Sequence, residues 1–262
     1  MGQNITKRVS LAAGLVLTTL FLGCCVNVGN NLKAKAKRSE TLTTPATDLT
    51  ALTVKTEVGT IRLESGDVSE ITIAADITVR SETDEEAEAW LDEVEIVTSQ
   101  SGSTLTIKAP KPAGFGRNQL STDLTITAPP DLVVRCTTNV GDIRVAGFTK
   151  DVTAKTDVGS IRCTGLREAI DLHTNVGDIK AVYAPEASPT LQAKVSTNVG
   201  SVDFAGPKEI SARLSARVNV GSIDTDRPLT VSGPIKKSIQ ATLGAAEGKI
   251  ALHTNVGSIK IR

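Results

Sequence analysis

Short runs of alternating apolar and polar residues recur along the chain, and each run is interrupted by a glycine. The phrase "TNVGDIRV", which begins at Thr138, is one of seven related copies, aligned on Gly59, Gly141, Gly159, Gly177, Gly200, Gly221 and Gly257. In most copies apolar residues or threonine stand five, three and one positions before the glycine, and apolar residues stand two and four positions after it. This period of two predicts two short strands, each with one buried face, joined by a tight bend.

The predicted bend carries Asn or an acidic residue two positions before the glycine. Asn and Asp tolerate left-handed backbone, and glycine accepts a positive φ at little cost. The bend residues are Asn139, Gly141, Asp157, Gly159, Asn175, Gly177, Asn198, Gly200, Asn219, Gly221, Asn255 and Gly257, with Glu57 in the first copy. Stacked copies would let the side-chain amides form a hydrogen-bonded ladder at roughly 4.8 Å per step.

The spacing of the glycines predicts a stack of coils. From Gly141 to Gly221 the gaps are 18, 18, 23 and 21 residues, about one coil each, and the final gap of 36 residues is expected to hold two coils. One coil cannot bury its own apolar face, but a stack can. We therefore predict an all-β solenoid domain over residues 49–262, with regular coils over 131–262.

Residues 49–130 are less regular and are expected to form strands plus one short helix. The segment "TDEEAEAWLDEVE" opens with Thr83 and Glu86 at capping-box spacing, and it places Ala87, Trp90 and Leu91 on one side. This pattern predicts a short helix packed against the strands. The loop "KPAGFGRNQL", which contains Phe115, is expected to be an exposed, mobile hairpin end.

The first residues have the pattern of a targeting sequence. Lys7 and Arg8 precede an apolar run over 11–22 that is too short to span a bilayer comfortably. Leu22, Gly23 and Cys24 resemble a bacterial lipobox, which implies a signal peptide over 1–23 and lipid on Cys24; the alternative is an ordinary secretory signal. Either reading places the mature protein outside the cytoplasm. The polar, basic segment 24–48 is expected to be a flexible tether.

This combination of a secretion signal, an irregular strand-rich first half with a short helix, and serial "TNVGDI" bends resembles the bacterial putative-adhesin family of extracellular β-solenoids. The resemblance covers residues 49–262. It implies a right-handed parallel β-helix. It brings no catalytic residues and no cofactor.

Composition narrows the classes of ligand. The 262 residues include 29 basic and 29 acidic ones, and this zero net charge argues against a nucleic-acid partner. Only 2% of the residues are aromatic, so few rings are present to stack on bases or sugars. The turn aspartates lack the glycine-aspartate spacing of calcium-binding β-rolls, so no metal site is predicted.

The outward position three residues after each glycine carries the candidate chemistry, a surface ladder of Arg144, Arg162, Lys180, Asp203 and Asp224. In adjacent coils Asp203 and Asp224 would lie near the roughly 5 Å separation of glycosidase carboxylates. His173 and His253 face outward and are expected to lie several coils apart, which disfavours a Ser-His-Asp site. Cys136 and Cys163 face inward, as two free thiols or as a disulfide between neighbouring coils.

These observations favour a non-catalytic cell-envelope lipoprotein that presents a β-solenoid surface to an envelope or surface protein or a glycan. The alternatives are a periplasmic structural scaffold and a polysaccharide-active enzyme that uses Asp203 and Asp224. The chain stops within its last repeat, so the final strand is expected to be an open edge. The charges of Lys260 and Arg262 would discourage edge-to-edge pairing, and self-association at this edge is the alternative.

Overall fold

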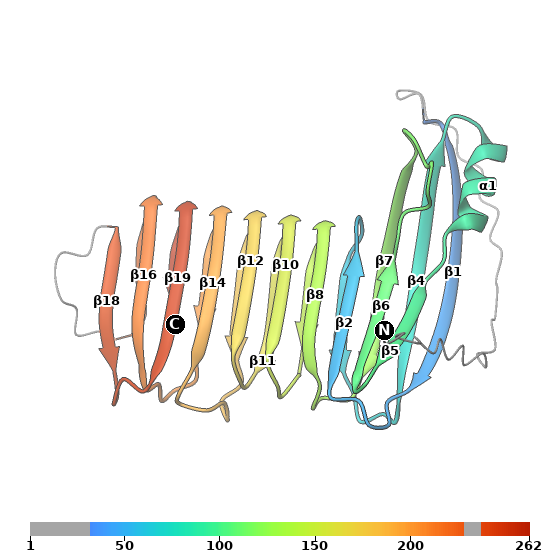
Figure 1. Ribbon diagram of the computed structural model, residues 1–262. Helices are drawn as coiled ribbons and strands as arrows, with labels where there is room; N and C mark the ends of the chain where they lie inside the picture. Colours follow the sequence, from blue (N-terminus) through green and yellow to red (C-terminus); the bar gives the residue numbers. More distant parts are fainter. Residues whose placement is uncertain (1–31, 228–236) are drawn as a thin grey trace, which may run out of the picture.

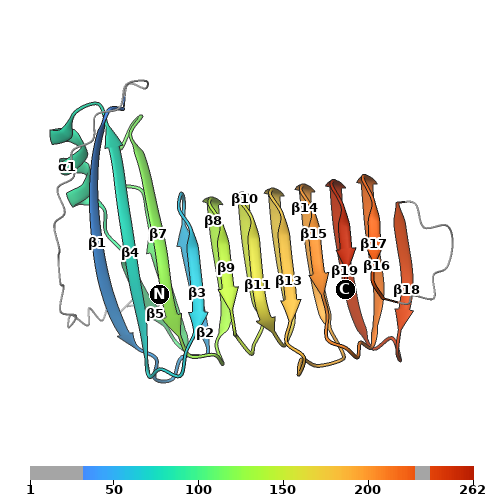
Figure 2. The same cartoon turned by 180° about the vertical axis from the view of Figure 1, so that it is seen from behind.

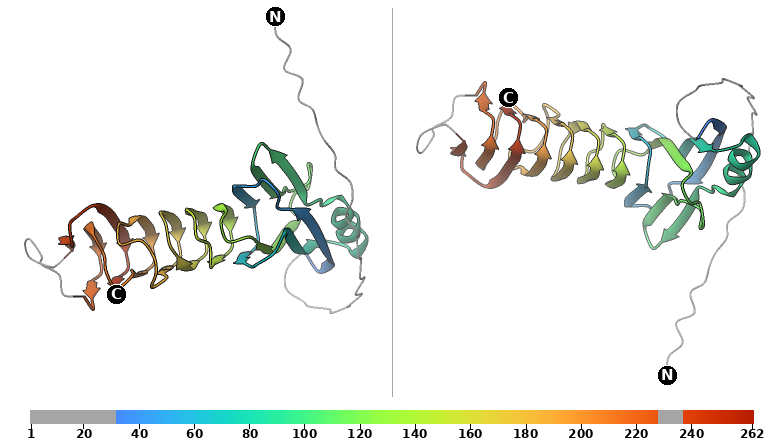
Figure 3. Two further views of the ribbon diagram at one scale, coloured as in Figure 1. Left: turned by 90° about the horizontal axis from the view of Figure 1, so that it is seen from below. Right: turned by 90° about the horizontal axis from the view of Figure 1, so that it is seen from above.

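The computed structural model describes residues 32–227 and 237–262, so the predicted signal peptide and Cys24 lie outside the described part of the chain. The described residues form two ten-stranded sheets, here called sheet A and sheet B, and the helix α1 (Asp84–Glu93). Figures 1 and 2 show the two sheets from opposite sides, and Figure 3 shows the elongated stack from below and from above.

Sheet A contains, in spatial order, β1 (Ala34–Pro45), β4 (Glu70–Ser81), β7 (Gln119–Ala128), β3 (Ile61–Ser65), β9 (Ile143–Ala146), β11 (Ile161–Leu166), β13 (Ile179–Tyr183), β15 (Val202–Ala205), β20 (Ile259–Ile261) and β17 (Ile223–Thr225). Sheet B contains β18 (Ser238–Leu243), β16 (Ala212–Val220), β19 (Gly248–Val256), β14 (Gln192–Val199), β12 (Ile170–Val176), β10 (Val152–Val158), β8 (Val133–Val140), β2 (Ala51–Thr56), β6 (Thr104–Ala109) and β5 (Val97–Ser101).

Each regular coil contributes one strand to each sheet, and strands of neighbouring coils pair in parallel. In sheet B, β10 pairs with both β8 and β12, and in sheet A, β11 pairs with both β9 and β13. The predicted all-β, solenoid-like architecture is confirmed. The first repeat, β2–β3, belongs to the regular stack, because β2 pairs with β8 and β3 with β9.

The core lies between the two sheets and is built from the inward positions of the repeat. Ile143, Ile161 and Ile179, each two residues after a glycine, are stacked in register and fully buried. The position three residues before the glycine is also buried and holds threonine in six of the seven copies, with Val218 in the seventh. The prediction that this position faces inward is confirmed.

The threonines bond the bends of neighbouring coils together. The Thr174 hydroxyl donates to the Gly159 carbonyl at 2.9 Å, and the Gly159 N–H donates to the Val176 carbonyl at 2.8 Å. Equivalent hydroxyl bonds, from 2.8 to 3.3 Å long, are made by Thr138, Thr156, Thr197 and Thr254. A buried hydroxyl therefore satisfies a carbonyl that the bend turns away from the strand ladder.

The bends need glycine because of both backbone conformation and space. Gly159 has a φ of +145°, and a Cβ there would lie 2.0 Å from the Gly141 carbonyl oxygen. The predicted amide ladder is also present: Asn198 donates to Asn175, and Asn255 donates to Asn198, each at 3.0 Å. Further bonds join Asn219 to Asn255 and Asn175 to Asp157.

The residue before each glycine departs from the predicted alternation. It was expected on the buried face, but the chain turns from sheet B to sheet A at this point and the side chain points outward. All seven positions hold an exposed valine, from 39% exposed at Val58 to 60% at Val220. We call this column the valine stripe; in spatial order it contains Val58, Val140, Val158, Val176, Val199, Val256 and Val220.

The order of the last coils differs from the order in the sequence. The final coil, β19–β20, lies between β14–β15 and β16–β17, so the C-terminal strand β20 pairs with β15 on one side and β17 on the other. The expectation of an open C-terminal edge strand is therefore wrong, and with it the proposed self-association there. The 36-residue gap does not hold two coils: β18 pairs antiparallel with β16, and β19 then returns into the stack.

The N-terminal end of the stack is closed by longer antiparallel strands and α1. The expected tether over 24–48 is wrong for residues 34–45, which form β1 and pair with β4 along its whole length. The residues of β1 are mostly small or polar, so their hydropathy gives little strand signal. Arg38 of β1 donates to the carbonyls of Leu91 and Val94 at the end of α1.

The predicted helix is confirmed, and its surroundings correct one expectation. Thr83 caps α1 by accepting the Glu86 N–H at 3.2 Å, as the capping spacing predicted. Phe115 is not at an exposed loop tip: it is 1% exposed and packs edge-on against Trp90, with ring centroids 5.2 Å apart. Both rings belong to a small second core under α1.

Candidate functional site

The outward column three residues after each bend glycine forms a continuous row of charges on sheet A. Parallel pairing in register aligns these residues across seven strands, at about 4.8 Å per step. Their spatial order is Arg62, Arg144, Arg162, Lys180, Asp203, Lys260 and Asp224. The predicted ladder is thus brought together, with two additions: Arg62 at its N-terminal end and Lys260 between the two aspartates.

The N-terminal half of this row is cationic. We call Arg62, Arg144, Arg162 and Lys180 the cationic ladder. Arg144 contacts its own neighbour Asp142 at 3.4 Å, and Arg62 reaches Thr125 at 3.5 Å. The Arg162 side chain is exposed and has no hydrogen bond or ion pair with any described residue. Like charges on adjacent strands repel, so this half of the row favours an anion placed across it.

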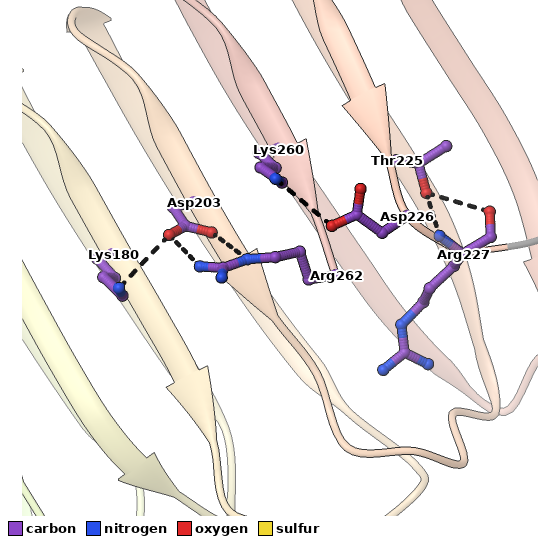
Figure 4. Close-up of polar contacts among 7 residues, drawn as sticks. All are labelled: Lys180, Asp203, Thr225, Asp226, Arg227, Lys260 and Arg262. Carbon is purple, nitrogen blue, oxygen red and sulfur yellow. Dashed lines mark hydrogen bonds and ion pairs between the residues drawn. The ribbon is translucent and has the colours of Figure 1, made fainter.

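In the C-terminal half of the row, Asp203 and Lys260 are engaged in ion pairs, which Figure 4 shows. Asp203 lies 3.7 Å from the Lys180 Nζ and accepts two bonds from the Arg262 guanidinium, one of them 3.0 Å long. Lys260 pairs with Asp226 at 3.5 Å. The hydrogen bond and the charge of Asp203 raise the pKa of Arg262 above its ordinary value. The charge available to a ligand therefore lies toward Arg62.

The insertion of the final coil separates the two predicted carboxylates. Asp203 and Asp224 each pair in register with Lys260, from opposite sides, so they lie in alternate coils, roughly 10 Å apart. The prediction that they occupy adjacent coils near 5 Å is wrong. Lys260 lies between the two aspartates, and the Arg262 guanidinium is bonded to the Asp203 carboxylate. Two carboxylates that act on a glycosidic bond need the space between them to be free.

The two histidines lie closer together than expected. His173 and His253 occupy alternate coils with Ser196 between them, and the His173 Nδ1 lies 2.8 Å from the Ser196 hydroxyl. The expected separation of several coils is wrong, because β19 pairs directly with β14. Acyl transfer also needs N–H donors for an oxyanion. In the middle of sheet B the backbone N–H groups around Ser196 are engaged in strand pairing, as the register of β12, β14 and β19 requires.

Cys136 and Cys163 are free and fully buried in the core. Burial raises the pKa of Cys136 from 9.0 to about 12, and it also raises the pKa of Cys163. The interpretation as two small buried thiols is confirmed and the alternative disulfide is wrong. In residues 32–227 and 237–262, no three His, Cys, Asp or Glu side chains are grouped to hold a metal, and no helix is long and apolar enough to cross a membrane.

A largely apolar cavity of about 320 Å³ lies where the regular stack meets the longer N-terminal strands. Val58, Ala109 and Leu120 line it together with Arg80 and Lys111. Lys111 also lies over the Phe115 ring, 4.9 Å from its centroid. The cavity adjoins the end of the valine stripe, since Val58 belongs to both.

The chain is similar to proteins of a known family. The model of the Toastrack DUF4097 family matches residues 28–262, and the chain belongs to this family. No curated protein matches the chain. Similar solved structures include the following two. The first is a "putative cell adhesion protein" from Clostridium sporogenes, 14% identical, with a TM-score of 0.49, covering 86% of this chain and 99% of its own. The second is a "putative adhesin" from Bacteroides fragilis, 18% identical, with a TM-score of 0.40, covering 88% of this chain and 98% of its own.

Proposed function

We propose that this protein is a non-catalytic, extracytoplasmic binding protein whose cationic ladder holds an acidic polymer of the cell envelope or cell surface. The observation that carries this proposal is Arg162, which is exposed and has no partner among the described residues, between Arg144 and Lys180. The ladder repeats at about 4.8 Å, so an extended polyanion can contact several cations at once. We also propose a right-handed winding of the coils, as parallel crossover connections favour.

Binding to a defined polyanion tests the ligand class. The probe is polygalacturonate, with neutral dextran as the control polymer, and binding to the full chain is measured by isothermal titration calorimetry at two salt concentrations. The variant Arg62→Gln, Arg144→Gln, Arg162→Gln should weaken binding at least about tenfold and flatten the salt dependence.

A second variant removes the same number of charges from the opposite face. Lys55, Arg135 and Lys155 lie on the outer face of sheet B, and their replacement by Gln should leave binding nearly unchanged. Equal losses in the two variants would mean that net charge alone attracts the polymer, and the assigned site would be wrong. Equal binding of dextran and polygalacturonate would exclude the anionic ligand.

The location of the protein is a separate part of the proposal. We propose that residues 1–23 are a lipoprotein signal and that Cys24 carries lipid, which leaves the solenoid anchored to the cell envelope. Protease treatment of intact cells, with wild type and Cys24→Ser compared, should remove the domain only when it is anchored at the surface. Protection until the envelope is opened would instead favour a periplasmic scaffold.

A further inference from the structure

The valine stripe is an apolar surface that the fold leaves uncovered. Its seven side chains stand at the bends of successive coils, and their strands pair in register, so the stripe is continuous over six strand spacings, roughly 29 Å. Its exposed area is on the order of 500 Å², within the range of the largest apolar patch of a typical monomer. Such patches are often interaction sites.

The bend itself does not require valine. The position needs a residue that accepts extended backbone, and threonine, which has the same shape and is also β-branched, would serve. The outward column three residues earlier varies freely, as Lys55, Thr137, Lys155, His173 and Ser196 show. The stripe keeps valine in all seven copies although every side chain is exposed. All seven stripe residues are therefore apolar, and the geometry of the coil does not explain why.

The two columns of residues beside the valine stripe limit the kind of partner that can bind to it. One flank is the amide ladder with Asp157 and Glu57, and the other carries only Ser, Thr and Asp, including Asp142 and Asp178. Neither column contains Lys or Arg, so the rim offers no attraction to anionic lipid. In addition, the N-terminal end of the stack extends above the level of the bends, as Figure 1 shows; we call this raised part, formed by β7, β4, β1 and α1, the shoulder. A flat membrane would contact the shoulder before it reached the valine stripe.

We propose that the valine stripe is the interface for a second copy of this chain, packed antiparallel along it. A second stripe has the same repeat of about 4.8 Å, so valines of the two copies can interdigitate along the full length. Two parallel copies would bring their shoulders into collision. In the antiparallel pair each shoulder lies beyond β16 of its partner, over the edge strand β18, whose upper end lies below that of β16 in Figure 1. About 500 Å² from each copy gives roughly 1,000 Å² in total, near the lower limit of specific interfaces.

Sedimentation velocity of the full chain tests the interface. The stripe variant is Val158→Thr, Val176→Thr, Val199→Thr, which preserves shape and β-branching. The control is Val68→Thr, Val97→Thr, which alters valines of similar exposure, 38% and 41%, away from the stripe. Wild type and control should form dimers at micromolar concentration, and the dissociation constant of the stripe variant should rise at least about tenfold.

Two outcomes would overturn the proposal. One is a stripe variant that dimerises like wild type, because self-association would then arise elsewhere in the chain. The other is a monomeric wild type whose flotation with phosphatidylglycerol vesicles is lost in the stripe variant, because the occupant would then be a membrane. Matching melting temperatures of the three proteins check that the substitutions leave the fold intact.

Oxidative crosslinking tests the orientation, in a background with Cys24 and Cys25 changed to serine. Val176→Cys lies at the middle of the stripe, where antiparallel copies bring the two identical positions close together. Val58→Cys lies at one end, where they are far apart. A crosslinked dimer only from Val176→Cys supports the antiparallel pair. Efficient crosslinking through Val58→Cys, or none through Val176→Cys, contradicts it.

Discussion

The bend glycines should be the residues least tolerant of substitution, and Gly159→Ala is the sharpest test. An alanine Cβ at this position would lie 2.0 Å from the Gly141 carbonyl oxygen and 2.5 Å from its carbon. Both atoms belong to the backbone of the adjacent coil, so no side chain can rotate away. The φ of +145° is also a conformation that glycine alone adopts readily. The two effects add at the same residue.

The expected loss follows from the contacts that must shift. Strained backbone costs about 1 to 3 kcal/mol. Moving the two coils apart also weakens the Gly141 N–H bond to the Val158 carbonyl, the Ile143 N–H bond to the Ser160 carbonyl and the hydroxyl bond from Thr156 to Gly141. At about 1 kcal/mol for each bond, Gly159→Ala should lower the free energy of unfolding by roughly 4 to 6 kcal/mol.

Gly102→Ala is the matched control. Gly102 also has a positive φ, +57°, but a Cβ there would meet nothing within 4 Å. This change should cost only about 1 to 2 kcal/mol, the ordinary penalty for left-handed backbone. Urea unfolding followed by circular dichroism measures both variants. If the two losses agree within about 0.5 kcal/mol, backbone conformation alone matters and the close approach of the coils is not the reason for glycine.

Three further predictions follow from the core and the row of charges. Thr174→Val should lower the free energy of unfolding by about 1 to 3 kcal/mol, because the Gly159 carbonyl loses its donor, whereas Thr174→Ser should retain most of the stability in the same urea assay. The pKa of Cys136 is about 12 in the folded state against 9.0 in the unfolded state, so its contribution to stability is complete below pH 9 and is lost as the pH rises toward 12; urea midpoints that stay constant over that range would contradict this. Asp203→Asn leaves Lys180 and Arg262 without their carboxylate but should cost less than about 1 kcal/mol, since all three groups are partly exposed; a larger loss would mean that the C-terminal residue anchors the inserted coil.

Local physical chemistry made much of the coil predictable. The positions of Ile161 and Thr174 follow from a side-chain period of two, and the bends follow from the conformational freedom of glycine. The capping of α1 by Thr83 was predictable because the bond joins residues three apart. Each of these features depends on contacts within one coil or one turn, or on equivalent residues of neighbouring coils that stack in register. A repeated sequence leads directly to such stacking.

The candidate site was predictable only in part. The repeat places Arg144, Arg162 and Lys180 in one outward column, which the structure confirms. The position of Arg62 in the same column could have been found by extending the alignment to the first copy. The role of Arg262 in neutralising Asp203 could not, because it depends on which coil lies beside β15.

The sequence by itself determined the coil: which residues are buried, where the chain bends and why glycine stands there. Only the tertiary structure decided the order of the coils, because equivalent coils present nearly identical pairing edges and chain order does not fix which one fills a given place. The insertion of β19–β20 separated Asp203 from Asp224 and brought His253 next to Ser196. The outward direction of the seven valines was likewise decided at the bends, where the chain leaves one sheet for the other and the strand alternation ends.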